Sequence, residues 1–424
     1  MGQQLSFYSS RGLELSKQHT GFPLVPVIYS QEVHGIQLED LSTNALSVIK
    51  TLRKAGHTAY LVGGCIRDLL LKETPKDFDV STSAKPEEIK IIFKNCILVG
   101  KRFRLAHIRF SNQIIEVSTF RAGNPDEDSL ITKDNLWGTP EEDVLRRDFT
   151  INGLFFDPFE KVIIDYTGGF EDIKNNFLQT IGDPVVRFKQ DPVRMLRLLK
   201  ILARYPFSVD KETSLALTAH RYELTKSSQT RVFEELLKML GSGYAEAFFR
   251  LLKDWGMLTV LFPYIDKAFN LSPIIQEQTF SLLRNVDHLV KKENLQPDRH
   301  FLLATFLFPI VNFNVHYIYQ KHKGINLTET FEFIRKFLEK LFANSFTSCS
   351  KKNFILTTLL IQMQYRLTPL KVSKKRNFFN KKLLQHSRFP EALLLLKLRS
   401  LVDSKWISAY RAWFTHWDPE KTEW

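Results

Sequence analysis

Two acidic residues, Asp77 and Asp79, stand two positions apart in the run of residues 76–80. In an extended strand, residues two apart project to the same face, so these carboxylates should lie together while Phe78 and Val80 face the core. Neighbouring carboxylates repel each other unless a cation lies between them, and hard oxygen ligands suit Mg²⁺. The spacing therefore predicts a divalent-metal site. A lone Asp-x-Asp is more often a solvated strand edge, so the surrounding motifs must decide.

A pair of glycines, Gly63 and Gly64, comes shortly before these acids, between an apolar run and Arg67. Glycines at a strand-to-helix turn let backbone N–H groups approach a phosphate, and a helix N-terminus favours negative charge. Arg67 adds a forked cation that suits phosphate oxygens. The pattern predicts a phosphate-binding turn beside the metal site, although a Gly-Gly pair alone is most often only a turn.

A third acid, Glu116, lies between Ile115 and Val117 in an apolar stretch, so its side chain should face opposite to its neighbours. Alone it would be an exposed strand acid. In one sheet with Asp77 and Asp79 it becomes the third carboxylate of a two-metal site, in which two Mg²⁺ ions roughly 4 Å apart assist a displacement at phosphorus.

Two further runs combine arginine with aspartate. Arg147 precedes Asp148, which fits either a surface salt-bridge cluster or an arginine that binds a triphosphate and an acid that orients it. Asp191 before a proline predicts a helix N-cap, and Arg194 and Arg197 follow on one face of that helix. Those arginines are either solvated or contact a nucleotide.

The elements that must position these residues form two regions. Strands are expected near residues 60–62, 76–80, 97–100, 105–110 and 114–121, with helices at 37–55, 86–93 and the first part of 141–152. From Asp191 onward helical periodicity dominates. We therefore predict an α+β protein, in which a head with a mixed sheet precedes an all-helical neck, body and tail. The expected parts are a flexible lead-in 1–33, a head 34–188, a neck 189–268 and a body with tail 269–424.

Composition limits the function classes. The chain has 424 residues, with 59 Lys plus Arg against 46 Asp plus Glu, and this excess favours a polyanionic partner, nucleic acid first. Its three cysteines are far apart, which argues against disulfides and zinc and fits a cytoplasmic protein. No run of 18 or more apolar residues occurs, so no membrane partner is expected.

Two basic runs suit nucleic acid. The first holds Lys101, Arg102 and Arg104 around Phe103. The second holds Lys374, Lys375 and Arg376 shortly before two phenylalanines. Basic residues interleaved with aromatics suit single-stranded RNA, and a solvated basic face is the alternative.

Together the motifs resemble class II nucleotidyltransferases, the family of CCA-adding tRNA nucleotidyltransferases and bacterial poly(A) polymerases. The resemblance rests on GGxxRD at 63–68, DxD at 77–79, RRDxTIN at 146–152, DYxGG at 165–169 and DPxRMLR at 191–197. It implies a polymerase β-like head, with Mg²⁺ held by Asp77 and Asp79. It further implies that Asp148 belongs to the active site with Glu116. The implied nucleotide contacts are Gly63, Gly64, Arg67, Arg147, Asp191, Arg194 and Arg197.

Residues 98–108 resemble the signature that separates poly(A) polymerases from CCA-adding relatives. The resemblance then implies ATP as substrate, RNA 3′ ends as acceptors, template-independent AMP transfer that marks RNA for decay, and RNA-decay or RNA-chaperone partners. Departures are a short loop at 121–140 and Gln190, where Glu commonly precedes the Asp. A CCA-adding enzyme stays the first alternative. A catalytically dead RNA-binding protein is the second, and the intact acids at 77, 79, 116 and 148 argue against it.

Overall fold

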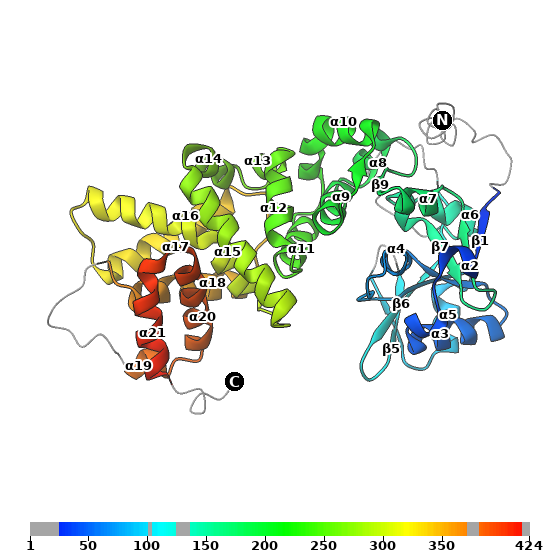
Figure 1. The fold of residues 1–424 in the computed structure, drawn as a ribbon, viewed down its shortest axis with the longest axis horizontal. Coiled ribbons are helices and arrows are strands. Elements are labelled where there is room, and N and C mark those ends of the chain that lie inside the picture. The colour runs from blue at the N-terminus through cyan, green and yellow to red at the C-terminus, as the bar shows by residue number, and fades with distance from the viewer. Residues whose placement is uncertain (1–24, 101–103, 124–135, 371–380, 418–424) are drawn as a thin grey trace. The chain divides into compact units, whose positions relative to one another are not determined.

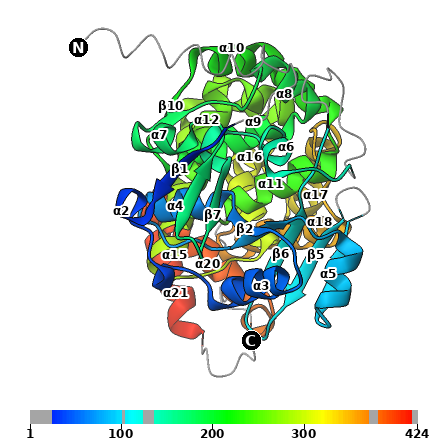
Figure 2. The ribbon, with the colours of Figure 1, turned by 90° about the vertical axis from the view of Figure 1, so that its right-hand side faces the viewer.

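The computed structural model describes residues 25–100, 104–123, 136–370 and 381–417. The chain divides into two compact units. The first, here the head unit, comprises residues up to Arg194 together with Pro206–His220. The second, here the helical unit, comprises Met195–Tyr205 and everything from Arg221 onward. Figures 1 and 2 show the head unit in blue to green and the helical unit in green to red.

The head unit is built on one eight-stranded sheet in the order β1-β8-β7-β2-β3-β6-β5-β4. Only β3 and β6 pair in parallel, and the other described pairings in this sheet are antiparallel. The predicted mixed sheet is therefore confirmed. The strands are β1 Val27–Ser30, β2 Ala59–Val62, β3 Asp79–Thr82, β4 Cys96–Val99, β5 Leu105–Arg109, β6 Ile114–Thr119, β7 Leu154–Asp157 and β8 Val162–Asp165.

One face of this sheet is covered by α3 (Thr43–Lys54) and α5 (Pro86–Ile92), which pack against β2 to β6. Helix α3 begins at Thr43, because the Ser42 side chain accepts a hydrogen bond from the Ala45 N–H. Its apolar residues, at helical spacing, are buried: Ala45, Val48, Ile49 and Leu52. Helix α5 agrees with the helix predicted at 86–93, whereas α3 is shorter than the helix predicted at 37–55.

The opposite face has a core at the β2–β7 side only. Val62 and Phe155 pack there with Phe120, Val144 and Ile181, and all five are buried. Val144 belongs to the short helix α6 (Pro140–Val144), which begins at a capping box formed by Thr139. The remaining head elements are α2 Gln31–His34, η1 Leu38–Asp40, α4 Gly64–Leu70, η2 Thr150–Asn152, α7 Gly169–Lys174, β9 Phe177–Leu178, α8 Pro184–Gln190, β10 Ser208–Val209 and α10 Lys211–His220.

Three local features differ from the sequence predictions. Strand β3 begins at Asp79, so Asp77 precedes the strand instead of lying within it. The predicted lead-in 1–33 contains β1, which pairs with β8 at the sheet edge. The neck predicted as all-helical, 189–268, contains the short strand β10, which pairs with β9.

The helical unit contains no strand in its described residues, as predicted. Helix α9, Val193–Arg204, begins in the head unit and continues into this one. The others are η3 Arg221–Lys226, α11 Gln229–Leu240, α12 Ala245–Asp254, α13 Met257–Leu261, α14 Pro263–Leu271, α15 Pro273–Lys292, α16 Arg299–Lys321, α17 Leu327–Ala343, α18 Lys351–Leu367, α19 Lys381–Leu384, α20 Phe389–Val402, η4 Ser404–Trp406 and α21 Ile407–His416.

Helix α16 is the central helix of this unit, packed against α11, α15, α17, α18 and α20. By length and composition it is also apolar enough to cross a membrane, although it holds no uninterrupted run of 18 apolar residues. Its most apolar window is 67% buried inside the unit. That burial is typical of a core helix.

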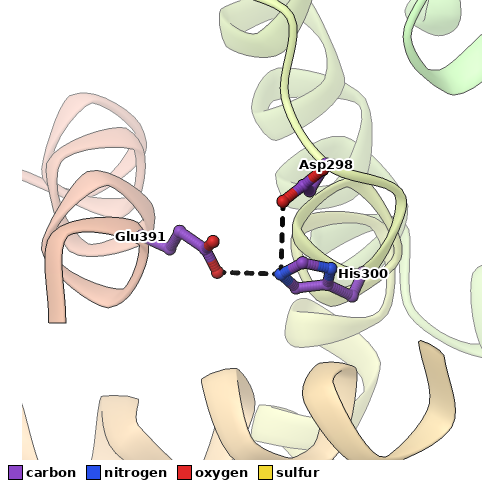
Figure 3. A group of neighbouring side chains, drawn as sticks. All are labelled: Asp298, His300 and Glu391. Atoms are coloured by element: carbon purple, nitrogen blue, oxygen red, sulfur yellow. Dashed lines mark hydrogen bonds and ion pairs between the residues drawn. The ribbon is translucent and has the colours of Figure 1, made fainter. Parts of the chain in front are cut away.

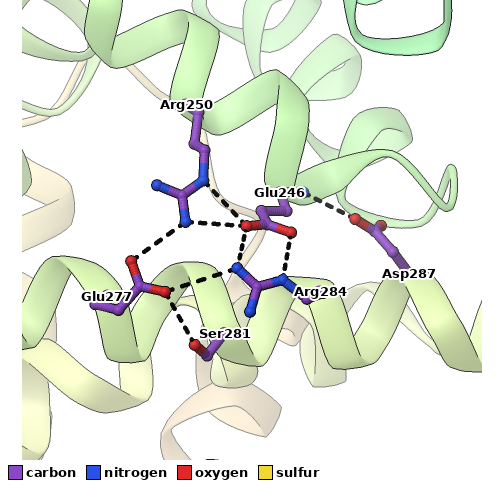
Figure 4. A network of polar contacts seen from close by, with 6 residues as sticks. All are labelled: Glu246, Arg250, Glu277, Ser281, Arg284 and Asp287. Carbon is purple, nitrogen blue, oxygen red and sulfur yellow. Dashed lines mark hydrogen bonds and ion pairs between the residues drawn. The ribbon is translucent and has the colours of Figure 1, made fainter.

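An ion-pair network joins α12 to α15 (Figure 4). Glu246 accepts from Arg250 and from Arg284, and both arginines also reach Glu277. Beside the network, the buried Asp287 carboxylate accepts from the N–H groups of Ala245 and Glu246 at the start of α12. Asp287 thus satisfies two backbone donors that a helix start leaves open.

Burial raises the pKa of the Asp287 carboxyl from 3.8 to about 6, although its backbone hydrogen bonds act in the opposite direction. The folded state therefore holds this proton more tightly than the unfolded state. The protonated Asp287 carboxyl therefore adds to the free energy of unfolding. This contribution is complete below pH 3.8 and is lost as the pH rises through about 6.

The Asp287→Asn variant should test this sign, because it cannot ionise. We expect its melting temperature, relative to the unsubstituted chain, to rise between about pH 4 and about pH 7. Glu277→Gln, at an exposed acid of the same network, is the control and should give a flat difference. A relative melting temperature that falls with pH would mean that the hydrogen bonds outweigh burial.

Candidate active site

Three residues on neighbouring strands form a cross-strand row on the face opposite α3 and α5. Asp79 of β3 is paired with Glu116 of β6, and Glu116 is paired with His107 of β5. Paired residues of a sheet project to the same side, so the three side chains share one face. The His107 Nε2 lies 3.3 Å from the Glu116 Oε1. The row continues to Ile97 on the edge strand β4.

The acids of this row act on one another. The pKa of Asp79 is raised to about 6, chiefly by burial and also by like-charge repulsion from Glu116 and Asp77, while Arg147 acts to lower it. Asp77 therefore lies close enough to interact with the pair although it precedes the strand. Such a group of carboxylate oxygens fits a hard divalent cation, which would relieve the repulsion.

Arg147 connects the acids to the glycine turn. Its guanidinium pairs with Asp143 at 2.9 Å and donates to the Ser81 Oγ at 3.2 Å. Gly63 lies beside it, since a Cβ on Gly63 would stand 3.6 Å from the arginine Nη1. Gly63 also has a φ of +78°, a backbone conformation that favours glycine. The surface salt-bridge interpretation of Arg147 is incomplete, because its side chain is only 18% exposed and faces the acids.

A second set of contacts holds Asp148. The Asn152 Nδ2 donates to the Asp148 Oδ1 at 3.0 Å, and the Asn152 Oδ1 accepts from Arg67 at 2.7 Å. Arg67, buried in α4, also pairs with Asp68 at 2.6 Å. Asn152 is thus the link between the glycine-turn helix and the acid of the RRDxTIN run. Nucleotide contact by Arg67 stays a prediction, since its guanidinium binds protein groups.

Arginines also crowd together near the backbone of residues 145–147. The pKa of Arg146 is lowered to about 10, chiefly by burial and also by the neighbouring charges of Arg121 and Arg194. The Arg194 guanidinium donates to the main-chain oxygens of Arg187 and Arg146. Converging cations of this kind suit a polyanion such as a triphosphate.

Arg187 also forms hydrogen bonds to the main chain of residues 145–147. Buried at 2% exposure, it donates to the main-chain oxygens of Leu145 and Arg147 and to the Gln190 side chain at 2.9 Å. Gln190 is thereby a neutral partner of a buried arginine. Asp191 ends α8.

Several predicted residues are not brought into this group. Arg197 belongs to the helical unit. Arg104 pairs with Glu87 at 2.7 Å. The predicted RNA-binding residues Lys101, Arg102, Lys374, Lys375 and Arg376 lie outside the described residues.

Sequence reasoning missed Asp143, Asn152, Arg121 and Arg187. The spacing of Asp143 and Arg147 at i and i+4 on a helical run was a usable signal. Asn152 lay inside a motif already singled out. Arg187 and Arg121 act through main-chain contacts or neighbours far away in sequence, which spacing does not reveal.

A separate cluster in the helical unit contains Asp298, His300 and Glu391 (Figure 3). The His300 Nε2 lies 2.9 Å from Glu391, but Arg388 binds the other oxygen of Glu391 at 2.6 Å. Because an arginine already neutralises the carboxylate, the cluster is an ion-pair tie between α16 and α20 rather than a metal centre.

Comparison with known proteins agrees with this geometry. Residues 59–179 match the family model of the poly(A) polymerase head domain. Residues 206–269 match the model described as the probable RNA- and SrmB-binding site of polymerase A. The CCA-adding enzyme of Bacillus stearothermophilus, solved in complex with CTP, superposes with a TM-score of 0.61 at 24% identity, covering 89% of this chain and 83% of that one. The fold is thus that of polymerase β-like nucleotidyltransferases.

Sequence relatives narrow the class. Poly(A) polymerase I of Escherichia coli O6:H1 is 35% identical over 407 residues, which are 93% of this chain and 86% of the relative. The CCA-adding enzyme of Lactobacillus helveticus is 36% identical over only 51% of this chain and 55% of its own length. The chain belongs to the poly(A) polymerase I family. The predicted fold class and the family resemblance are confirmed.

The Asn152 bridge can be tested directly. Asn152→Ala should lower kcat for nucleotide transfer roughly ten- to a hundredfold, because Arg67 and Asp148 lose their shared partner, with little change in the KM for RNA. Asn152→Asp, which offers Asp148 no N–H, should be equally poor. Asn44→Ala, at a half-buried asparagine of α3 whose amide contacts Asn112 and Gln113, is the control. Unchanged kcat in both Asn152 variants would show that the bridge has no role.

Proposed function

We propose that the protein transfers AMP from ATP to RNA 3′ ends without a template and releases pyrophosphate. The observation that carries the proposal is the acidic row of Asp79 and Glu116 beside Arg147 and the glycine turn. A 3′-hydroxyl attacks the α-phosphorus, the bond between the α- and β-phosphates breaks, and pyrophosphate leaves. The family membership supports the adenylyl specificity.

Some of these residues would bind the metal ion, and others bind the negatively charged triphosphate. Asp77 and Asp79 would hold Mg²⁺, for which we propose two ions, and the metal supplies positive charge to the triphosphate when bound. Arg147 and the N–H groups at Gly63 and Gly64 bind the triphosphate, and Asn152 keeps Asp148 in place. Catalysis then consists mainly of positioning and electrostatic stabilisation.

We infer a cytoplasmic enzyme that tails transcripts and marks them for decay, with RNA-decay or RNA-chaperone proteins as partners. CCA addition to tRNA stays the second candidate, because a CCA-adding relative is 36% identical over 51% of this chain.

A purified protein incubated with Mg²⁺, a labelled unstructured RNA and one nucleoside triphosphate at a time separates the candidates. We expect a ladder of long products with ATP alone. Addition of two C residues and one A to a tRNA lacking its 3′ end, with no ladder on other RNA, would contradict the proposal.

Asp79→Asn should lower AMP incorporation about a hundredfold or more, because it removes a charged metal ligand, while RNA affinity stays nearly unchanged. Asp40→Asn, at an exposed acid of the same unit, is the matched control. Full activity of Asp79→Asn would refute the assignment of the acids.

Replacing Lys374, Lys375 and Arg376 by Gln should weaken RNA binding and flatten its salt dependence. If each side chain contacts one phosphate of single-stranded RNA, the slope of log affinity against log salt should decrease by roughly 2. Binding measured by fluorescence anisotropy over a salt series checks this. An unchanged slope would assign the run to a solvated basic face.

A further inference from the structure

The sheet face that carries Asp79 is filled on one side of the acids and exposed on the other. On the filled side, Val62 pairs with Asp79 in the neighbouring strand and Phe155 follows, and both are buried in the core beside α6. On the other side lie β6, β5 and β4. Their apolar side chains on this face include three that stay exposed: Ile97 at 42%, Val99 at 41% and Ile114 at 50%.

These exposed residues continue the catalytic row. Ile97 is paired with His107, which is paired with Glu116, which is paired with Asp79. Since neighbouring strands are about 4.8 Å apart, Ile97 lies about 14 Å from Asp79 along the face. Val99 and Ile114 are two residues from members of the row, so they share its side of the sheet.

The in-line geometry of the reaction indicates that the acceptor RNA lies on the exposed side of the acids. In an in-line displacement, the attacking oxygen and the leaving group lie on opposite sides of the phosphorus. Gly63 and Gly64, the proposed triphosphate contacts, directly follow β2 on the filled side. The nucleotide that carries the attacking hydroxyl must then lie over β6, β5 and β4.

The chemistry of the exposed face suits a nucleotide. Branched apolar side chains can pack against the flat face of a base and against a ribose, and their exposure is otherwise unfavourable. Arg109, exposed on the same face two residues after His107, forms no ion pair within the described part of the chain. A cation at this position complements a backbone phosphate.

We propose that this exposed face, formed by Ile97, Val99, His107, Arg109 and Ile114, binds the 3′-terminal nucleotides of the acceptor RNA. The inference rests on the proposed function, because it assigns the acceptor to one side of the same acids. It gives the β4–β5 hairpin strands a role in placing the hydroxyl, separate from the nucleotide contacts on the β2 side.

A triple variant tests the face without disturbing the sheet. Ile97→Thr, Val99→Thr and Ile114→Thr keep branched side chains that favour strands but replace apolar groups by hydroxyls. The KM for a short unstructured RNA should rise roughly tenfold, while the KM for ATP stays within about twofold. Equal increases in both KM values would overturn the proposal.

The opposite edge of the sheet provides the control. Val27 and Ile28 of β1 are also exposed apolar residues of an edge strand, at 50% and 52%. The double variant Val27→Thr, Ile28→Thr should leave both KM values unchanged. If the triple variant instead changes the oligomeric state with an unchanged KM for RNA, the face is an interface between copies and the proposal fails.

Photo-crosslinking gives a readout independent of catalysis. An RNA ending in 4-thiouridine, bound to the full chain without ATP, should crosslink to peptides that contain β4, β5 or β6. Crosslinks confined to the helical unit would refute the acceptor face even where AMP transfer is normal. Conversely, crosslinks at the face without AMP transfer by the unsubstituted chain would refute the proposed function and leave RNA binding there intact.

Discussion

The repulsion among Asp77, Asp79 and Glu116 is the constraint on which the head unit depends. Carboxylates that repel one another would separate if the backbone allowed it. The one parallel pairing described in the eight-stranded sheet, β3 with β6, prevents this by fixing Asp79 beside Glu116. Arg147 provides the opposing charge. It is held in turn by Asp143 and, through its main-chain oxygen, by the buried Arg187. The fold therefore supports an arrangement that is unfavourable in itself.

Features that depend on residues close together in the sequence could be predicted from it, whereas features that depend on residues far apart could not. The alternation around Glu116 is local, and the structure shows it as predicted. Strand order is not local: nothing in residues 27–30 reveals that they pair with β8. The start of β3 at Asp79 was also missed, because a strand boundary depends on which partners are available. For the site, residue types and motifs were sufficient to identify the acids, whereas main-chain contacts such as those of Arg187 required the structure.

The DYxGG motif shows that a family motif need not carry chemistry. The Asp165 carboxylate accepts from the N–H groups of Thr167 through Phe170 at the start of α7, so its charge serves a helix terminus. A Cβ on Gly169 would stand 2.0 Å from the Thr150 main-chain oxygen, which explains the second glycine. This close contact fixes η2, and η2 presents Asn152 to Asp148. The motif acts on the reaction only by positioning.

The head unit therefore contains a group of acids and, next to it, a group of arginines. Negative charge accumulates at the acids around Asp79, and positive charge accumulates at the arginines around Arg146. Arg147 connects the two groups: it is one of the arginines, it lowers the pKa of Asp79, and it pairs with Asp143. A metal–triphosphate complex carries both complementary charges in one ligand, so it can relieve both repulsions at once. A free cation or a free triphosphate relieves only one. Charge complementarity of this kind favours the complete substrate over its parts, and it arises from residues that the sheet and α6 hold in place before any ligand binds.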